Sequence, residues 1–113
     1  MISFYNLKQA NLSRCMQWHP GGVNSWSLSD WGVAAGGEMG EMLNVIKKLN
    51  RLRDGLRGNK ETEKELRLNL GKEIADTVIY LDLLASAAGF DLGALVKDKF
   101  NEVSQRNGFR ERL

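Results

Sequence analysis

The stretch IADTVIYLDLLASAA, from Ile74 to Ala88, decides the fold. It spans about four helical turns and is apolar on almost every side, interrupted chiefly by Asp76, Thr77, Tyr80, Asp82 and Ser86. A helix that is apolar all round is buried all round. A chain of 113 residues can hardly surround such a helix alone, so we expect a second copy of the chain to cover part of it.

Helix start and stop signals lie on both sides of this stretch. Four helices are expected. The first runs from Ser3 to Trp18 with Ser3 as N-cap, and the second from Ser27 or Ser29 to Arg53. The third begins between Lys60 and Glu63 and ends at Ala88, before Gly89, and the fourth runs from Leu92 to Arg106 with Asp91 as N-cap. The segment His19 to Ser27, which contains Pro20, Gly21 and Gly22, reads as a loop. The sequence therefore predicts one all-α domain over residues 1–113, a four-helix bundle whose core is completed by dimerisation.

Composition and charge exclude several classes of protein. The net charge of +2 is small and the basic residues are mixed with acidic ones, so nucleic acid is not an expected partner. Cys15 is the one cysteine, which rules out an intrachain disulfide and favours a packing role over a nucleophile. No stretch resembles a signal peptide or approaches about 20 apolar residues, so we expect a cytoplasmic protein without membrane contact.

Two acidic pairs are the strongest functional signal. Glu38 and Glu41 form one pair and Glu73 and Asp76 the other, each spaced i, i+3 and therefore one turn apart on one helix face. Such a pair is usually a solvated face. Here both pairs are embedded in apolar sequence, where unpaired charge is expensive. If the pairs face each other, their mutual repulsion calls for a bound cation.

The type of ligand indicates the metal. Carboxylates without cysteine or histidine favour Mg²⁺, with Mn²⁺ as a substitute, and argue against zinc. A ferritin-like di-iron site would need Glu-x-x-His motifs, which the chain lacks. Asp82 lies nearly opposite Glu73 on the helix, so we expect it to form a structural hydrogen bond instead of joining the metal. A partly filled magnesium shell is normally completed by water and substrate phosphates, and Lys97 with Asn101, spaced i, i+4, could bind them.

The order Glu38-x-x-Glu41, Glu73-x-x-Asp76, Lys97-x-x-x-Asn101 resembles the MazG-like all-α nucleoside triphosphate pyrophosphohydrolases. The similarity covers about Trp31 to Asn107, although the link from Met42 to Lys72 is longer than in the compact members. The resemblance implies a magnesium-dependent hydrolase that converts a (deoxy)nucleoside triphosphate to the monophosphate and pyrophosphate, in house-cleaning of noncanonical or surplus nucleotides. It also implies a homodimer, or a tetramer built from two dimers.

Carried over by position, the four acids would be metal ligands, and Glu41 or Glu38 would orient or deprotonate the attacking water. Lys97 and Asn101 would contact the substrate, with Lys47 or Lys48 as further candidates for the pyrophosphate. Base recognition would fall to Trp18, Trp31 or His19, although a core role explains the tryptophans equally well. The alternative is a regulatory module of the same fold that senses nucleotides without turnover.

Overall fold

The computed structural model describes all 113 residues and contains only helices. These are α1 (Phe4–Trp18), the 3₁₀ helix η1 (Gly22–Ser25), α2 (Leu28–Arg53), α3 (Glu63–Ala87) and α4 (Leu92–Arg106). The all-α class is confirmed, and the helix boundaries agree with the sequence patterns to within a few residues.

The helices begin where side chains can satisfy their first backbone N–H groups. Ser3 accepts a hydrogen bond from the backbone N–H of Asn6, and Asp91 does the same for Ala94. Ser27 and Asp30 form a reciprocal capping box at the start of α2. Each such cap contributes about 1 kcal/mol, which fixes where each helix starts.

One local element differs from expectation. The segment between α1 and α2 is not a plain loop, because Gly22–Ser25 forms one 3₁₀ turn. Gly21 and Gly22 have φ values of +94° and +74°, which only glycine adopts readily, and the Ser25 hydroxyl donates to the Gly22 carbonyl oxygen at 2.7 Å. The two glycines therefore shape a tight corner as well as ending α1.

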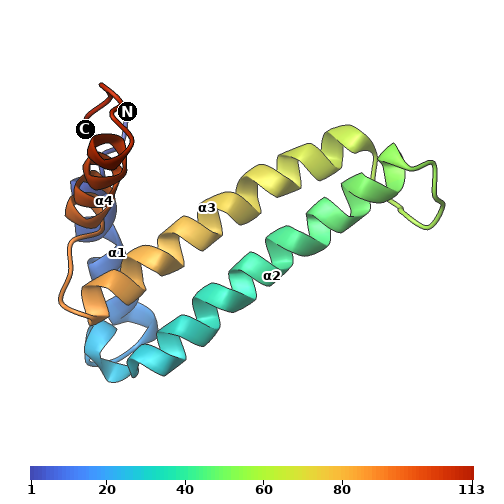
Figure 1. The fold of residues 1–113 in the computed structure, drawn as a ribbon. Helices are drawn as coiled ribbons and strands as arrows, with labels where there is room; N and C mark the ends of the chain where they lie inside the picture. Colours follow the sequence, from blue (N-terminus) through green and yellow to red (C-terminus); the bar gives the residue numbers. More distant parts are fainter.

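Helices α2 and α3 form a long antiparallel hairpin (Figure 1). Helix α2 has 26 residues and α3 has 25, so each is nearly 40 Å long. Their connection is tied back to α2 by two contacts: Asn59 Nδ2 donates to the Lys48 carbonyl oxygen at 2.7 Å, and Lys48 Nζ pairs with Glu61 Oε1 at 2.9 Å. The longer link that the sequence shows is thus an ordered tip on the hairpin.

Helices α1 and α4 pack together as a second arm at the other end of the hairpin, beside the chain termini (Figure 1). Helix α4 leaves α3 at 99° and contacts α1 and α3 but not α2. The protomer therefore has the shape of an L, with extents of 46 × 45 × 29 Å. Each arm is two helices thick, so much of its apolar surface has no neighbour.

The buried core lies where the two arms meet. Cys15, Trp31 and Leu83 pack together there, and burial raises the pKa of the Cys15 thiol. Beside them, Asn11 Nδ2 donates to Asp82 Oδ2 at 3.0 Å and to the Ile79 carbonyl oxygen at 2.9 Å. Asp82 is 1% exposed, which confirms that this acid has a structural hydrogen-bonding role.

Candidate metal centre

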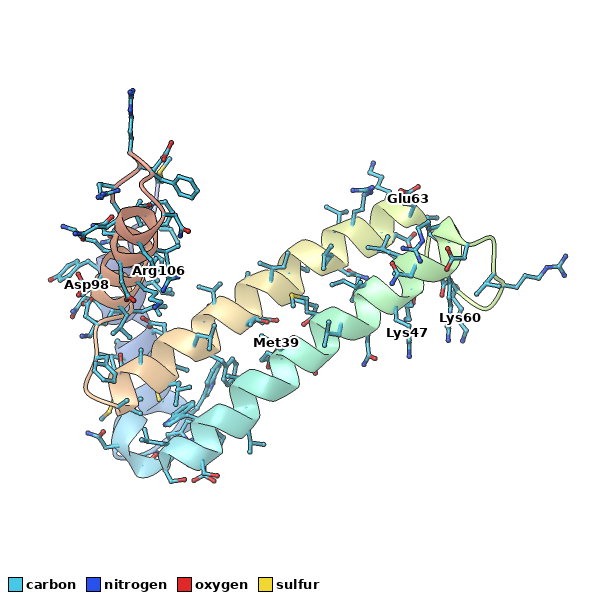
Figure 2. The ribbon with its side chains drawn as sticks, in the orientation of Figure 1. Met39, Lys47, Lys60, Glu63, Asp98 and Arg106 are labelled. Atoms are coloured by element: carbon cyan, nitrogen blue, oxygen red, sulfur yellow. The ribbon has the colours of Figure 1, made fainter.

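The hairpin brings the two acidic pairs together halfway along its length. Glu38 from α2 and Glu73 and Asp76 from α3 each offer one carboxylate oxygen, and these oxygens all lie within 4.8 Å of one another. The cluster is beside Met39, which Figure 2 labels in the middle of the hairpin. The antiparallel packing of α2 on α3 produces this meeting, because it sets the centre of one helix against the centre of the other.

The cluster is electrostatically unfavourable by itself. Partial burial raises the pKa of Glu38, and the negative charges of Glu41, Asp76 and Glu73 raise it further. Partial burial likewise raises the pKa of Glu73, with the charge and a hydrogen bond of Glu41 and the charge of Asp76 adding to the effect. Both carboxylates are therefore held in surroundings that disfavour their ionised form.

No lysine or arginine of the chain relieves this repulsion. All six ion pairs of the structure lie elsewhere, and none includes Glu38, Glu41, Glu73 or Asp76. Glu73 Oε2 is also buried without a hydrogen-bond partner, which is unusual for a native carboxylate. Closely spaced oxygens, an orphaned buried lone pair and the lack of a counter-charge together fit a hard divalent cation such as Mg²⁺.

Glu41 stands at the edge of this cluster. It is exposed and is not one of the three mutually close carboxylates, but it is near enough to raise the pKa of both Glu38 and Glu73. Of the four acids predicted to form one site, the structure brings three together directly and keeps the fourth within electrostatic range.

Lys97 and Asn101 do not reach the cluster within one chain. They lie on α4, which does not contact α2, and Figure 2 labels the neighbouring Asp98 on the other arm of the L. Asn101 instead exchanges hydrogen bonds with the backbone of Leu113, accepting from its N–H at 2.8 Å and donating to its carbonyl oxygen at 3.2 Å. Any contact of these residues with the acidic site would have to come from another copy.

The aromatic candidates occupy different surroundings. Trp31 is 1% exposed, and its indole N–H donates to the Val23 carbonyl oxygen at 2.8 Å. This position matches the core role that the sequence left open. His19 packs edge-on against Trp26 and Trp31, with ring centroids 4.4 and 5.3 Å away. Trp18 is 61% exposed, so of the two tryptophans named for base recognition it is the accessible one. The Arg14 guanidinium lies over its ring, 5.2 Å from the ring centroid.

The two lysine candidates lie toward the hairpin tip. Lys48 is engaged by Glu61, whereas Lys47 is exposed and has no ion pair. Both are some 14 Å or more along α2 from Glu38. They are closer to the loop than to the acidic cluster.

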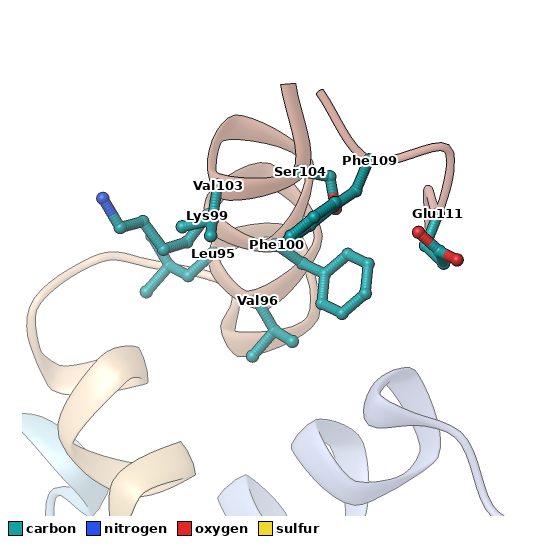
Figure 3. A pocket seen from close by; sticks show the side chains of 8 residues that line it. All are labelled: Leu95, Val96, Lys99, Phe100, Val103, Ser104, Phe109 and Glu111. Carbon is teal, nitrogen blue, oxygen red and sulfur yellow. The ribbon is translucent and has the colours of Figure 1, made fainter. Parts of the chain in front are cut away.

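An apolar groove on α4 was not predicted from the sequence. This groove has a volume of about 630 Å³ and lies against the C-terminal segment, as Figure 3 shows, lined by Leu95, Val96, Lys99, Phe100, Val103, Ser104, Phe109 and Glu111. It is the largest cavity of the protomer and is remote from the acidic cluster. The spacing of Val96, Phe100 and Val103 at i, i+4 and i+7 is the sequence signal that could have revealed an apolar face there.

Comparison with models of known protein families, with curated proteins and with solved structures gives no match for this chain. No single helix combines the length and the apolar composition of a membrane span, and α3 and α4 reach them only jointly, across their 99° bend.

Proposed function

We propose that this chain is a magnesium-dependent nucleotide pyrophosphohydrolase, which converts a (deoxy)nucleoside triphosphate to the monophosphate and pyrophosphate. One observation carries the proposal: Glu38, Glu73 and Asp76 converge to within 4.8 Å with no cation of the chain beside them. The resemblance of the two acidic pairs and the Lys97-x-x-x-Asn101 pattern to the MazG-like enzymes supplies the reaction class.

In this proposal, different carboxylates bind the metal and activate the attacking water. Glu38, Glu73 and Asp76 would hold Mg²⁺, which when bound supplies positive charge to neutralise the triphosphate. Glu41 is exposed at the rim, so its carboxylate can accept a proton from an attacking water or orient that water. Glu38, which sits inside the cluster, is the second candidate for this role.

The proposal includes a second copy of the chain. The large exposed surface area of the protomer supports this dimer. The protomer exposes 8125 Å², whereas a folded monomer of 12.7 kDa is expected to expose about 6,200 Å². Its radius of gyration is 17.3 Å, against about 13 Å for a compact chain of this length. The excess of about 1,900 Å² per protomer, or about 3,800 Å² for two copies, lies in the range that obligate homodimers bury.

The surface to be covered is apolar. Met39 and Leu43 of α2, and Ile74, Val78 and Leu81 of α3, remain between 37% and 54% exposed. Val78 lies about 160° round α3 from Asp76, so this apolar face is on the side of the hairpin away from the acids. We call these five residues the hairpin face.

Glycines extend the hairpin face along α2. Apart from neighbouring residues and the backbone of α2 itself, no atom lies within 4 Å of the place where a Cβ would stand on Gly32, Gly36 or Gly40, so these glycines do not serve helix packing inside the protomer. They leave room for a partner helix or a ligand.

Together with the α4 groove, the hairpin face gives the protomer two unpartnered apolar surfaces, enough for a homodimer or a dimer of dimers. Lys97 and Asn101 would act from a partner copy.

The test is pyrophosphate release from a panel of canonical and modified triphosphates, with and without Mg²⁺. Glu41→Gln and Asp76→Asn are expected to lose activity by at least about 100-fold while remaining folded. Asp98→Asn, which neutralises an exposed acid on α4, is the matched control and should keep full activity.

Full activity in the Glu41 and Asp76 variants would refute the acidic site. Release of orthophosphate would mean that a different bond is cleaved. Nucleotide binding by calorimetry without product over hours would indicate the alternative function, a nucleotide-sensing module.

A further inference from the structure

The tip of the hairpin carries a larger positive charge than the net charge of the whole chain suggests. Residues 47–67 contain eight lysines and arginines and four acids, a net charge of +4. The remainder of the chain is therefore −2, since the whole carries +2. The fold gathers this basic segment at the end of the long arm, the part of the molecule farthest from α1 and α4 (Figure 1).

Most of these cations lack a carboxylate partner. Lys48, Arg53 and Arg67 form ion pairs with Glu61, Asp54 and Glu63 respectively. The other five have no acidic oxygen within 4.0 Å, and we call them the tip cations: Lys47, Arg51, Arg57, Lys60 and Lys64. Four of the five side chains are exposed and Arg51 is partly so.

The loop holds some of these like charges side by side. Asn59 is hydrogen-bonded to the Lys48 backbone at 2.7 Å and Glu61 is paired with the Lys48 side chain at 2.9 Å. Lys60, between them, is thereby kept close to α2, and Figure 2 shows it projecting from the same side of the tip as Lys47. Adjacent like charges repel, so an anionic partner would stabilise this arrangement.

The acidic cluster cannot neutralise the tip. Lys47 is the tip cation nearest to Glu38 along α2, at nine residues or about 14 Å of helix, and Arg51 is 13 residues or about 20 Å away. The Debye length at physiological ionic strength is about 8 Å, so these opposite charges are largely screened from each other. The tip therefore presents its own positive field to the solvent.

The side chains at the tip also restrict the kind of anion. Residues 47–67 contain no aromatic residue, so the stacking platform that single-stranded nucleic acids need is missing. The exposed apolar side chains of this segment are Leu52 and Leu56, at 39% and 60%, too few for insertion into a lipid surface. Several unpaired cations with no aromatic and few apolar neighbours suit a dense row of phosphates. Duplex nucleic acid carries one phosphate per about 1.7 Å of its axis.

We propose that the hairpin tip binds the phosphate backbone of duplex nucleic acid through the tip cations, without reading the base sequence. Lys47 and Arg51 would bind from α2, Arg57 and Lys60 from the loop, and Lys64 from the start of α3. Each contact releases a condensed counterion, so the affinity depends steeply on salt. This surface is separate from the acidic cluster in the fold, since the loop and the start of α3 supply three of its five cations.

The experiment measures the affinity of the full chain for a fluorescent 20-base-pair duplex by anisotropy, between 50 and 200 mM salt. Five phosphate contacts predict a loss of affinity of about 500-fold over this range for the wild type. The triple variant Lys47→Ala, Arg57→Ala, Lys60→Ala keeps two contacts, so the loss should shrink to about 12-fold. A second duplex of unrelated sequence should give the same values.

The control variant removes three cations from the other end of the molecule, as Lys99→Ala, Arg110→Ala, Arg112→Ala. It has the same net charge as the tip variant and should keep the wild-type salt dependence. Circular dichroism checks that both variants are folded. The proposal is overturned if the two triple variants bind alike, if the wild type does not bind at 50 mM salt and 100 µM protein, or if phosphatidylserine vesicles bind it while the duplex does not.

Discussion

The dimer can be tested by removing apolar side chains from the hairpin face. We choose the double substitution Ile74→Ala, Val78→Ala, because both side chains project from α3 at one-turn spacing and are 47% and 37% exposed in the protomer. Neither belongs to the small buried core, so the protomer should retain its helices. The substitutions should act mainly on association.

The expected size follows from the area still exposed. Full burial of such a side chain is worth about 2 kcal/mol, so burying the remaining half or third contributes about 1 kcal/mol for Ile74 and somewhat less for Val78. Because an isologous interface contains each residue twice, the double substitution should weaken the dimer by about 3.5 kcal/mol. This corresponds to an increase in the dimer Kd of about 300-fold.

Sedimentation equilibrium over a range of protein concentrations measures this change directly. Leu56→Ala is the control, since Leu56 is 60% exposed but lies in the connection at the hairpin tip, away from the hairpin face. It should leave the Kd unchanged. Dimerisation through the hairpin face is refuted if the wild type is monomeric at 100 µM, or if the double variant and Leu56→Ala associate as tightly as the wild type.

Three further predictions concern stability. Glu73→Gln should raise the melting temperature of the metal-free protein at pH 7, because the raised pKa of Glu73 means that its ionised form destabilises the fold. This gain in melting temperature should fade as the pH falls below about 4, where the carboxylate of the wild type is protonated. An equal gain at pH 7 and below about pH 4 would contradict the prediction. Mg²⁺ should raise the melting temperature of the wild type but not of this variant. Asn11→Ala should lower the free energy of unfolding in urea by about 2–3 kcal/mol, because it leaves the buried Asp82 carboxylate without its amide donor. Gln9→Ala, an exposed site on the same helix, should change that free energy by less than about 0.5 kcal/mol, and similar losses in the two variants would count against the role of Asn11.

Local structure could be predicted from the sequence wherever one side chain determines it. Ser3 and Asp91 are N-caps as expected, and Ser27 is the N-cap of α2 from the two serines considered, because capping depends on hydrogen bonds within one turn. Asp82 was separated from the acidic pairs by helix periodicity alone, and its hydrogen bond to Asn11 confirms that separation. The identity of its partner could not be predicted, since Asn11 lies 71 residues away in the sequence.

Features that depend on how helices pack could not be predicted. The 99° turn between α3 and α4 follows from packing at the corner, and no motif in the sequence specifies that angle. For the same reason, the sequence named Lys97 and Asn101 as substrate contacts but could not show that α4 does not contact α2 within the chain. The spacing of the acidic pairs predicted a common face, but only the structure shows that Glu41 lies at the rim and Glu38 inside.

The hydrogen bond from Asn11 to Asp82 also has a consequence for the order of folding. The α2–α3 hairpin joins segments that follow one another in the chain, so its loop closes early and at a low cost in entropy. The Asn11 contact spans most of the chain and can form only once α3 offers Asp82 in place. Substitutions at Asn11 should therefore accelerate unfolding and leave the refolding rate nearly unchanged, which makes α1 the last helix to join the native structure.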